Sequence, residues 1–64
     1  MWIVNKYGVA IDTDKVARFR KNGDTLLADM IGLPPTVHTT IIGTVALEDI
    51  IANIASGTKV MEVR

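Results

Sequence analysis

The most informative part of this sequence is residues 15–31, which read KVARFRKNGDTLLADMI. The first half alternates as a β-strand does, so its side chains divide between two faces. Ala17 and Phe19 share one face, and the other carries Val16, Arg18 and Arg20. The Asn22-Gly23 pair that follows is typical of a two-residue type I′ turn, whose central residues both need positive φ. The stretch therefore predicts an antiparallel β-hairpin.

The returning strand of this hairpin also presents two faces. One face carries Leu26, Ala28 and Met30, and the other carries Leu27, Asp29 and Ile31. Beyond it, Gly32-Leu33-Pro34-Pro35 interrupts the pattern, because consecutive prolines donate no backbone hydrogen bonds. The β-branched residues of segment 36–42 then predict another strand.

Two short extended runs are predicted before the hairpin. Residues 2–4 begin the first run, a polar turn follows at residues 5–8, and residues 9–11 form the second run. Asp12-Thr13-Asp14 comes next, and its side chains favour a local turn because they bond to nearby backbone amides. The chain ends in an alternating segment, residues 58–64, which predicts a last strand.

The hydrophobic period changes after Gly43. One apolar helix stripe is formed by residues at i, i+3, i+4 and i+7: Leu47, Ile50, Ile51 and Ile54. Thr44 is the expected N-cap, and Ser56-Gly57 is the expected stop. We therefore expect a helix over residues 45–56 whose apolar stripe packs into the core.

These elements predict a single α+β domain over residues 1–64, in the order β-β-β-β-α-β. The expected sheet is antiparallel or mixed, has about five strands and is covered by the one helix. Because one short helix covers only part of such a sheet, some apolar sheet surface is expected to stay open. Candidates for that surface are Val16, Leu27, Ile31 and Ile41, and they are the reason to expect a homodimer.

Composition limits the function classes. The chain has 64 residues, seven Lys+Arg, seven Asp+Glu, one His and no Cys, and 48% of its residues are hydrophobic. This composition excludes intrinsic disorder and thiol chemistry, and zero net charge disfavours a domain that grips nucleic acid. The chain opens without a basic leader and sustained apolar region, and residues 41–55 are too short and too polar to cross a bilayer. We expect a cytoplasmic protein with neither a membrane nor a nucleic-acid partner.

Few residues are suited to catalysis or metal binding. His38 is the only side chain whose ordinary pKa lies near neutrality, but no Cys and no Ser-His-acid set accompanies it, so a structural or surface role is favoured. Asp12, Asp14 and Asp29 could offer oxygen ligands to a hard cation. They lack the spacing of a calcium loop, so a turn is favoured at Asp12-Thr13-Asp14. We therefore expect no enzyme activity, no catalytic or metal site and no cofactor.

A basic group on the hairpin is the best candidate for binding. Arg18 and Arg20 share a strand face and Lys21 adjoins the tip, so together they could hold a partner's carboxylates or a phosphate. The competing interpretation is a solvated face whose charges prevent edge-to-edge aggregation. The predicted partner-binding surface contains Val16, Arg18, Arg20, Lys21, Asn22 and Asp24. Replacing Arg18 and Arg20 by Glu is expected to abolish binding without unfolding the chain.

The opening of the chain resembles a group of short proteins. Residues 1–8, MWIVNKYG, and 11–16, IDTDKV, are similar to the beginnings of very short hypothetical proteins of phages and prophages of Gram-positive bacteria. These often open with an apolar strand, an Asn and an I-x-T-D-x-V segment, and end with a helix that starts with acidic residues, as this chain does from Ala46. The resemblance implies an accessory protein of a mobile element that binds a host protein, such as a defence or regulatory factor. It assigns no functional residue.

The sequence therefore favours a non-enzymatic protein-binding module that is homo-oligomeric and acts on a larger protein partner. The alternative is a homo-oligomeric binder of a nucleotide or another small phosphate-bearing ligand, held by Arg18, Arg20 or His38 at a subunit interface. A phosphate-bearing ligand would raise the thermal stability as its concentration rises above the dissociation constant. That shift distinguishes the second hypothesis from the first.

Overall fold

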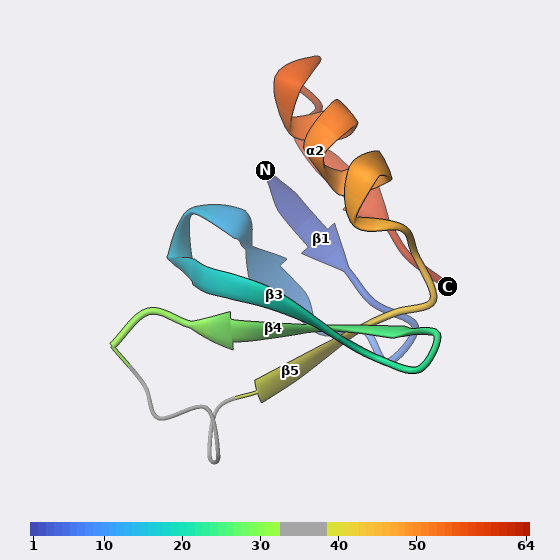
Figure 1. Ribbon diagram of the computed structural model, residues 1–64. Helices are drawn as coiled ribbons and strands as arrows, with labels where there is room; N and C mark the ends of the chain where they lie inside the picture. Colours follow the sequence, from blue (N-terminus) through green and yellow to red (C-terminus); the bar gives the residue numbers. More distant parts are fainter. Residues whose placement is uncertain (33–38) are drawn as a thin grey trace.

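The predicted hairpin is present in the computed structural model, which describes residues 1–32 and 39–64. Its two strands are β3 (Val16–Asn22) and β4 (Thr25–Met30), and β5 (Thr39–Gly43) pairs with the other edge of β4. All three strands run antiparallel to their neighbours. Figure 1 shows this antiparallel sheet below the helix. The segment of residues 33–38, which includes His38 and the start of the strand predicted over residues 36–42, lies outside the described residues.

The hairpin turn differs by one residue from the predicted one. Asn22 pairs directly with Thr25, so the two central residues of the turn are Gly23 and Asp24. Gly23 has a φ of 61°, and no residue other than glycine has positive φ in the described part of the chain. A glycine with positive φ at the first central position is the pattern of a type II′ turn, so the type I′ prediction was wrong.

A second, mixed sheet is built from the ends of the chain. Its strands are β1 (Trp2–Val4), β2 (Ala10–Asp12) and β6 (Val60–Glu62), in the order β2-β1-β6. Strand β1 is antiparallel to β2 and parallel to β6. The described residues thus form six strands in two sheets, where the sequence predicted about five in one sheet.

Two polar turns explain this division into two sheets. The turn at residues 5–8 folds β2 back onto β1. The second turn is the one predicted at Asp12-Thr13-Asp14: the Asp12 carboxylate accepts a hydrogen bond of 3.0 Å from the Asp14 amide and begins the 3-10 helix η1 (Thr13–Lys15). This short helix redirects the chain into β3, which therefore starts a new sheet.

The α-helix α2 (Leu47–Ala55) is shorter than the predicted span of 45–56. Its N-cap is Ala46, with no side-chain hydrogen bond, so the prediction of Thr44 as the cap was wrong. The helix ends at the predicted Ser56-Gly57 stop. The Gly57 amide donates to the Ile54 carbonyl and the Thr58 amide to the Asn53 carbonyl, which is the Schellman pattern that a glycine with positive φ completes.

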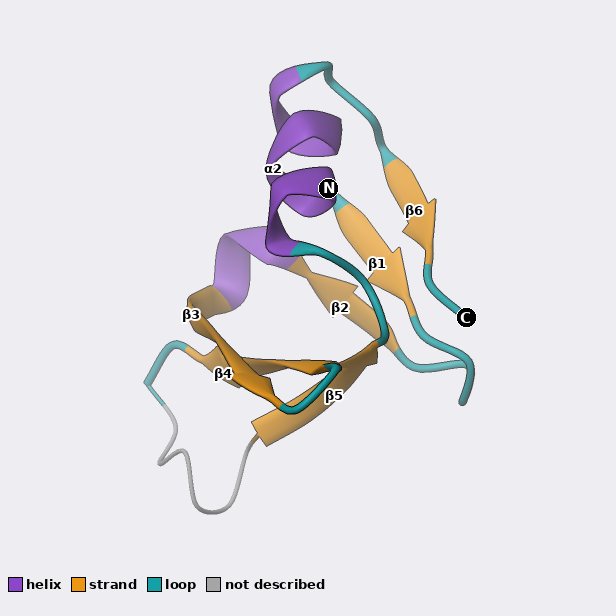
Figure 2. Ribbon diagram, turned by 45° about the vertical axis from the view of Figure 1, so that its right-hand side comes forward, coloured by secondary structure: helices purple, strands orange, loops and turns teal. Residues whose placement is uncertain are grey.

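The core lies where the helix and the two sheets meet. In Figure 2 the helix lies alongside β1 and β6, with the β3–β4–β5 sheet below them. The buried apolar side chains come from both sheets, the helix and the C-terminal segment: Ile3, Ile11, Leu26, Ala28, Ile42, Ile50 and Val63. Ile50 is the only one of them that the helix supplies. Ile51 and Ile54 are 56% and 47% exposed, so the prediction that the whole apolar stripe is core was wrong.

Close contacts hold the two sheets together. The Asn5 side chain, 6% exposed, donates a hydrogen bond of 2.7 Å to the Ile41 carbonyl on the edge of β5. Its Oδ1 accepts from the amides of Tyr7 and Val9, at 3.0 and 2.9 Å. Asn5 therefore shapes the β1–β2 turn and ties the mixed sheet to the antiparallel one.

Gly43 makes the second junction. A Cβ at this position would lie 2.9 Å from a methyl group of Val63, and the φ of Gly43 is 131°. Both conditions favour glycine, because an L side chain would be strained by the backbone and crowded by the C-terminal segment.

Candidate binding surface

Arg18 and Arg20 lie on the face of the antiparallel sheet that points away from the core. The register places Arg18 opposite Asp29, and Arg20 opposite Leu27. Arg18 Nε is 2.6 Å from Asp29 Oδ2, and Arg20 Nε is 2.7 Å from the same oxygen. The prediction that the two arginines share a face is confirmed, and their shared anchor is a single carboxylate.

Asp29 is buried although it belongs to the outward face, since it is only 2% exposed. Its second oxygen, Oδ1, accepts hydrogen bonds from Arg20 Nη2 at 3.0 Å and from the Thr39 hydroxyl at 2.9 Å. The hydrogen bonds from Arg20 and Arg18 hold the pKa of Asp29 well below its usual range, against the opposing effect of burial. In turn, the hydrogen bond to Asp29 raises the pKa of Arg20. Asp29 is therefore ionised at neutral pH and fixes both guanidinium groups.

Each arginine side chain is bonded to Asp29 and remains partly exposed to solvent. Their side chains are 60% and 40% exposed, Arg18 being the more open. Within the described residues Arg18 bonds only through Nε, so its two terminal Nη groups have no hydrogen-bond partner there. That free end is the part of a guanidinium that binds a carboxylate or phosphate with two parallel hydrogen bonds. One carboxylate also balances only one of the two cations.

Apolar side chains adjoin the arginines. Leu27 pairs with Arg20 on one side and with Ile41 on the other, and directly paired residues share a face. Leu27 is half-buried and Ile41 is 43% exposed. We call this surface the arginine face, and it consists of Arg18, Arg20, Leu27, Asp29, Thr39 and Ile41. It combines an aliphatic centre with a fixed pair of cations.

Val16 does not lie on this face, so the prediction that it shares a face with Arg18 and Arg20 was wrong. The β3–β4 register shifts between Val16 and Arg18, which reverses the alternation of side chains along β3. Val16 consequently pairs with Met30 and packs, half-buried, against the core. Of the apolar residues expected to stay open, Ile31 and Ile41 are exposed, whereas Leu27 and Val16 are half-buried.

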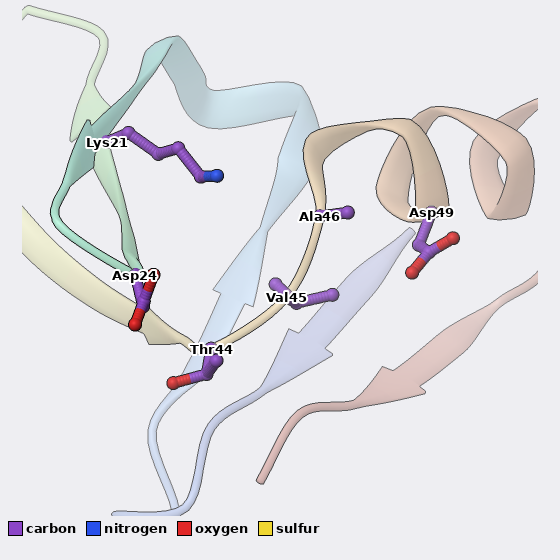
Figure 3. Close-up of a pocket in the computed structure, with 6 residues that line it drawn as sticks. All are labelled: Lys21, Asp24, Thr44, Val45, Ala46 and Asp49. Atoms are coloured by element: carbon purple, nitrogen blue, oxygen red, sulfur yellow. The ribbon is translucent and has the colours of Figure 1, made fainter.

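The other predicted residues lie near the hairpin tip. Asn22 is exposed at the last pair of the ladder. Lys21 pairs with the core residue Leu26, so its side chain leaves the sheet on the side opposite Arg18 and Arg20. Figure 3 shows Lys21 and Asp24 at a shallow hollow beside the start of the helix. The hollow has a volume of about 320 Å³ and is lined by Lys21, Asp24, Thr44, Val45, Ala46 and Asp49.

The structure thus divides the predicted surface into two sides of the hairpin. Arg18 and Arg20 form the arginine face, while Lys21 and Asp24 border the hollow near the helix. The sequence interpretation missed the tie to Asp29 because of the turn. A turn at Asn22-Gly23 would pair Arg18 with Leu27, whereas the observed turn pairs it with Asp29. A search for opposite charges across every allowed register would have found this pair.

The chain was compared with protein-family models, curated proteins and solved structures. No protein-family model, curated protein or solved structure matches this chain. Within residues 1–32 and 39–64, no three His, Asp or Glu side chains gather as a metal site would require, and no helix is long and apolar enough to span a membrane.

Proposed function

We propose that this chain is a non-enzymatic binding module that occupies a surface of a larger protein through its arginine face. The observation that carries the proposal is the burial of Asp29 beneath two arginines that remain open to solvent. An exposed arginine normally loses side-chain entropy when it binds a partner. Here Asp29 and Thr39 already fix Arg20, and Asp29 fixes Arg18, so part of that cost is met in the free protein.

The composition of the face also supports a protein partner. Arginine is enriched among the residues that contribute most to protein interfaces, and such residues work best beside groups that exclude water. Leu27 and Ile41 provide those groups next to Arg20. The resemblance of the opening residues to small phage and prophage proteins agrees with a module of this kind, in which a host protein would be the partner.

The test compares two variants that each lose one exposed cation. In Arg18→Gln the arginine face loses its open guanidinium, while Arg20 still neutralises Asp29. In the control, Lys6→Gln, the charge is removed from the β1–β2 turn instead. Tagged wild-type protein and both variants are used to capture proteins from nuclease-treated lysate, after circular dichroism has confirmed folding.

We expect one protein to be retained in stoichiometric amount by the wild type and by Lys6→Gln, and lost with Arg18→Gln. Equal retention by all three proteins would contradict the assignment of the arginine face. If the wild type retains no protein but is stabilised thermally by a panel of nucleotides, the phosphate-binding alternative replaces the proposal.

The structure also changes the variant first suggested by the sequence. Replacing both arginines by Glu would place two further carboxylates around the buried Asp29 and remove all its cationic partners. A buried charge without partners is strongly destabilising. Loss of binding by that double variant would therefore not separate recognition from unfolding, whereas Arg18→Gln does.

A further inference from the structure

Helix α2 carries an apolar stripe that its own chain leaves open. Ile50 faces the core and is fully buried, but Ile51 and Ile54 are 56% and 47% exposed. At 100° per residue, Leu47, Ile51 and Ile54 lie within one narrow sector of the helix surface. Leu47 is half-buried, so the open part of the stripe runs along the second half of the helix. An exposed aliphatic stripe of this kind is typical of a contact surface.

A hollow continues the stripe beyond the end of the helix. It has a volume of about 470 Å³ and is lined by Met1, Trp2, Ile54, Gly57, Thr58 and Lys59. Trp2 is 48% exposed and supplies an aromatic wall. Lys59 is the only charged side chain in the lining, so this end of the stripe is basic.

The opposite end of the stripe is acidic. Glu48 and Asp49 occupy the first turn of α2, and the last turn contains no basic residue. Glu48 is exposed and neighbours Ile51, since residues three apart are adjacent on a helix surface, and it also borders a hollow beside Lys21 of β3. Within the described residues, neither Glu48 nor Lys59 has an ion-pair partner. The stripe therefore has an unpaired acid at its start and an unpaired base just past its end.

We propose that this surface binds a second copy of the chain, with the two α2 helices antiparallel across a two-fold axis near Ile51. Such an arrangement places the acidic start of each helix beside the basic end of the other. The Glu48–Lys59 pair then forms twice, once in each direction. Antiparallel helices also bring together opposite ends of their dipoles.

The dimensions agree with this pairing. Glu48 lies about 4.5 Å from Ile51 along the helix axis, at a rise of about 1.5 Å per residue. In the antiparallel partner that acid falls the same distance past Ile51 toward the helix end. That level is occupied by Ile54, and the Ser56-Gly57 turn begins about 3 Å further along. Lys59 follows this turn, and its long stem borders the same hollow as Ile54, so its ammonium group can reach back to the acid. The aliphatic stripe of one copy then covers Ile54 and the hollow of the other.

The reciprocity of the charges favours a second copy over a foreign helix. A two-fold interface needs both complementary halves on one chain, and this stripe has them. Such an interface is closed, so association stops at the dimer. It leaves the arginine face free, and the inference is independent of the function proposed for that face.

The first experiment measures the oligomeric state by sedimentation equilibrium over a range of concentrations. We expect the wild type to be dimeric and Ile51→Glu to be monomeric, because the substitution puts two carboxylates at the two-fold axis. Val9→Glu is the matched control, since Val9 is 45% exposed but lies outside the stripe. A wild type that is monomeric throughout, or an Ile51→Glu variant that stays dimeric, would overturn the inference.

A charge exchange tests the antiparallel arrangement. Glu48→Lys and Lys59→Glu should each raise the dimer dissociation constant about tenfold, because an exposed pair is lost twice and replaced by like charges. The double variant Glu48→Lys/Lys59→Glu restores opposite charges and should return the constant close to the wild-type value. Failure of the double variant to associate more tightly than either single variant would rule out this register.

Discussion

The antiparallel and the mixed sheet have the same number of strands but differ in how they are held. Strands β3, β4 and β5 are 7, 6 and 5 residues long, and β3 and β4 are joined by a two-residue turn. Each strand of the mixed sheet has 3 residues, and β1 pairs with β6 from the other end of the chain, so that Trp2 lies opposite Val60. The β3–β4 hairpin of the first sheet therefore relies on local pairing. The second sheet combines the local β1–β2 pair with a β1–β6 pair that requires closure of almost the whole chain.

This difference affects how strongly each sheet depends on packing against the core. The few hydrogen bonds of a short, non-local sheet offset little of the entropy lost in closing the chain, so such a sheet depends on the side chains that it packs into the core. A longer hairpin can tolerate a charged, open face. In this protein the local sheet carries the arginine face on its outer side and contributes Leu26, Ala28 and Ile42 to the core on its inner side, next to Ile3 and Ile11 of the mixed sheet.

The largest effect is expected when the mixed sheet loses its central core contact. Ile3→Ala should lower the free energy of unfolding by about 2–5 kcal/mol, because Ile3 is fully buried in the strand on which β2 and β6 both depend. Chemical denaturation followed by tryptophan fluorescence measures the change. Val9→Ala, at an exposed position of the same sheet region, should cost about 0.5 kcal/mol.

Hydrogen exchange shows where the loss occurs. In Ile3→Ala, amides of β1, β2 and β6 should lose more protection than those of β3 and β4. Equal loss over both sheets would mean that the two sheets open as one unit, and the distinction between them would fail.

The same distinction explains what could be predicted from the sequence. The presence of the hairpin, the turn after Asp12 and the helix stop at Ser56-Gly57 depend on neighbouring residues, and local signals predicted them, although not the type and register of the hairpin turn. The α+β class follows from these elements. The division into two sheets was not predictable in this way, because the pairing of β1 with β6 depends on how the whole chain closes.

The arginine face was only partly predictable for a related reason. Alternation identified the shared face of Arg18 and Arg20, but not the register that brings Asp29 to them. A shift of the turn by one residue moves the partner of every β3 residue by two positions. The helical period of the sequence likewise identifies residues that share a face without identifying what covers them. It placed Ile51 and Ile54 on one stripe with Ile50, but period does not say which part of a stripe the sheets cover.

A smaller effect is expected where the two sheets are tied together. Asn5→Asp keeps an oxygen for the amides of Tyr7 and Val9, but it replaces the donor that bonds to the Ile41 carbonyl. We expect a loss of about 1–3 kcal/mol in unfolding free energy at neutral pH, because a buried acceptor loses its partner and faces a carboxylate. Asn5→Ala removes both functions and is the reference.

Nuclear magnetic resonance separates these two functions of Asn5. In Asn5→Asp the Tyr7 and Val9 amide signals should stay close to their wild-type positions, while signals around Ile41 shift. In Asn5→Ala both sets should move. Unchanged signals around Ile41 in both variants would show that the junction does not depend on this hydrogen bond.

The smallest effect is expected at the arginine face, where solvent screens the charges. The pKa of Asp29 is lower in the folded chain than the value of about 4 found in unfolded peptides. Its contribution to stability is therefore complete above about pH 4, and it declines as the pH falls from there toward the folded pKa. High salt should weaken the same contribution, because Arg18 and Arg20 are 60% and 40% exposed.

Thermal unfolding between acidic and neutral pH can isolate this contribution by comparing Asp29→Asn with the wild type. The melting temperature of the wild type should fall more steeply below pH 4 than that of Asp29→Asn, because the variant has no carboxylate to protonate at this position. Asp24→Asn removes a negative charge from the exposed tip of the same hairpin and serves as the control. If Asp29→Asn and the wild type lose stability in parallel below pH 4, Asp29 does not anchor the arginine pair. The open face would then be held by its strands alone, and the arginines would approach a partner without preorganisation.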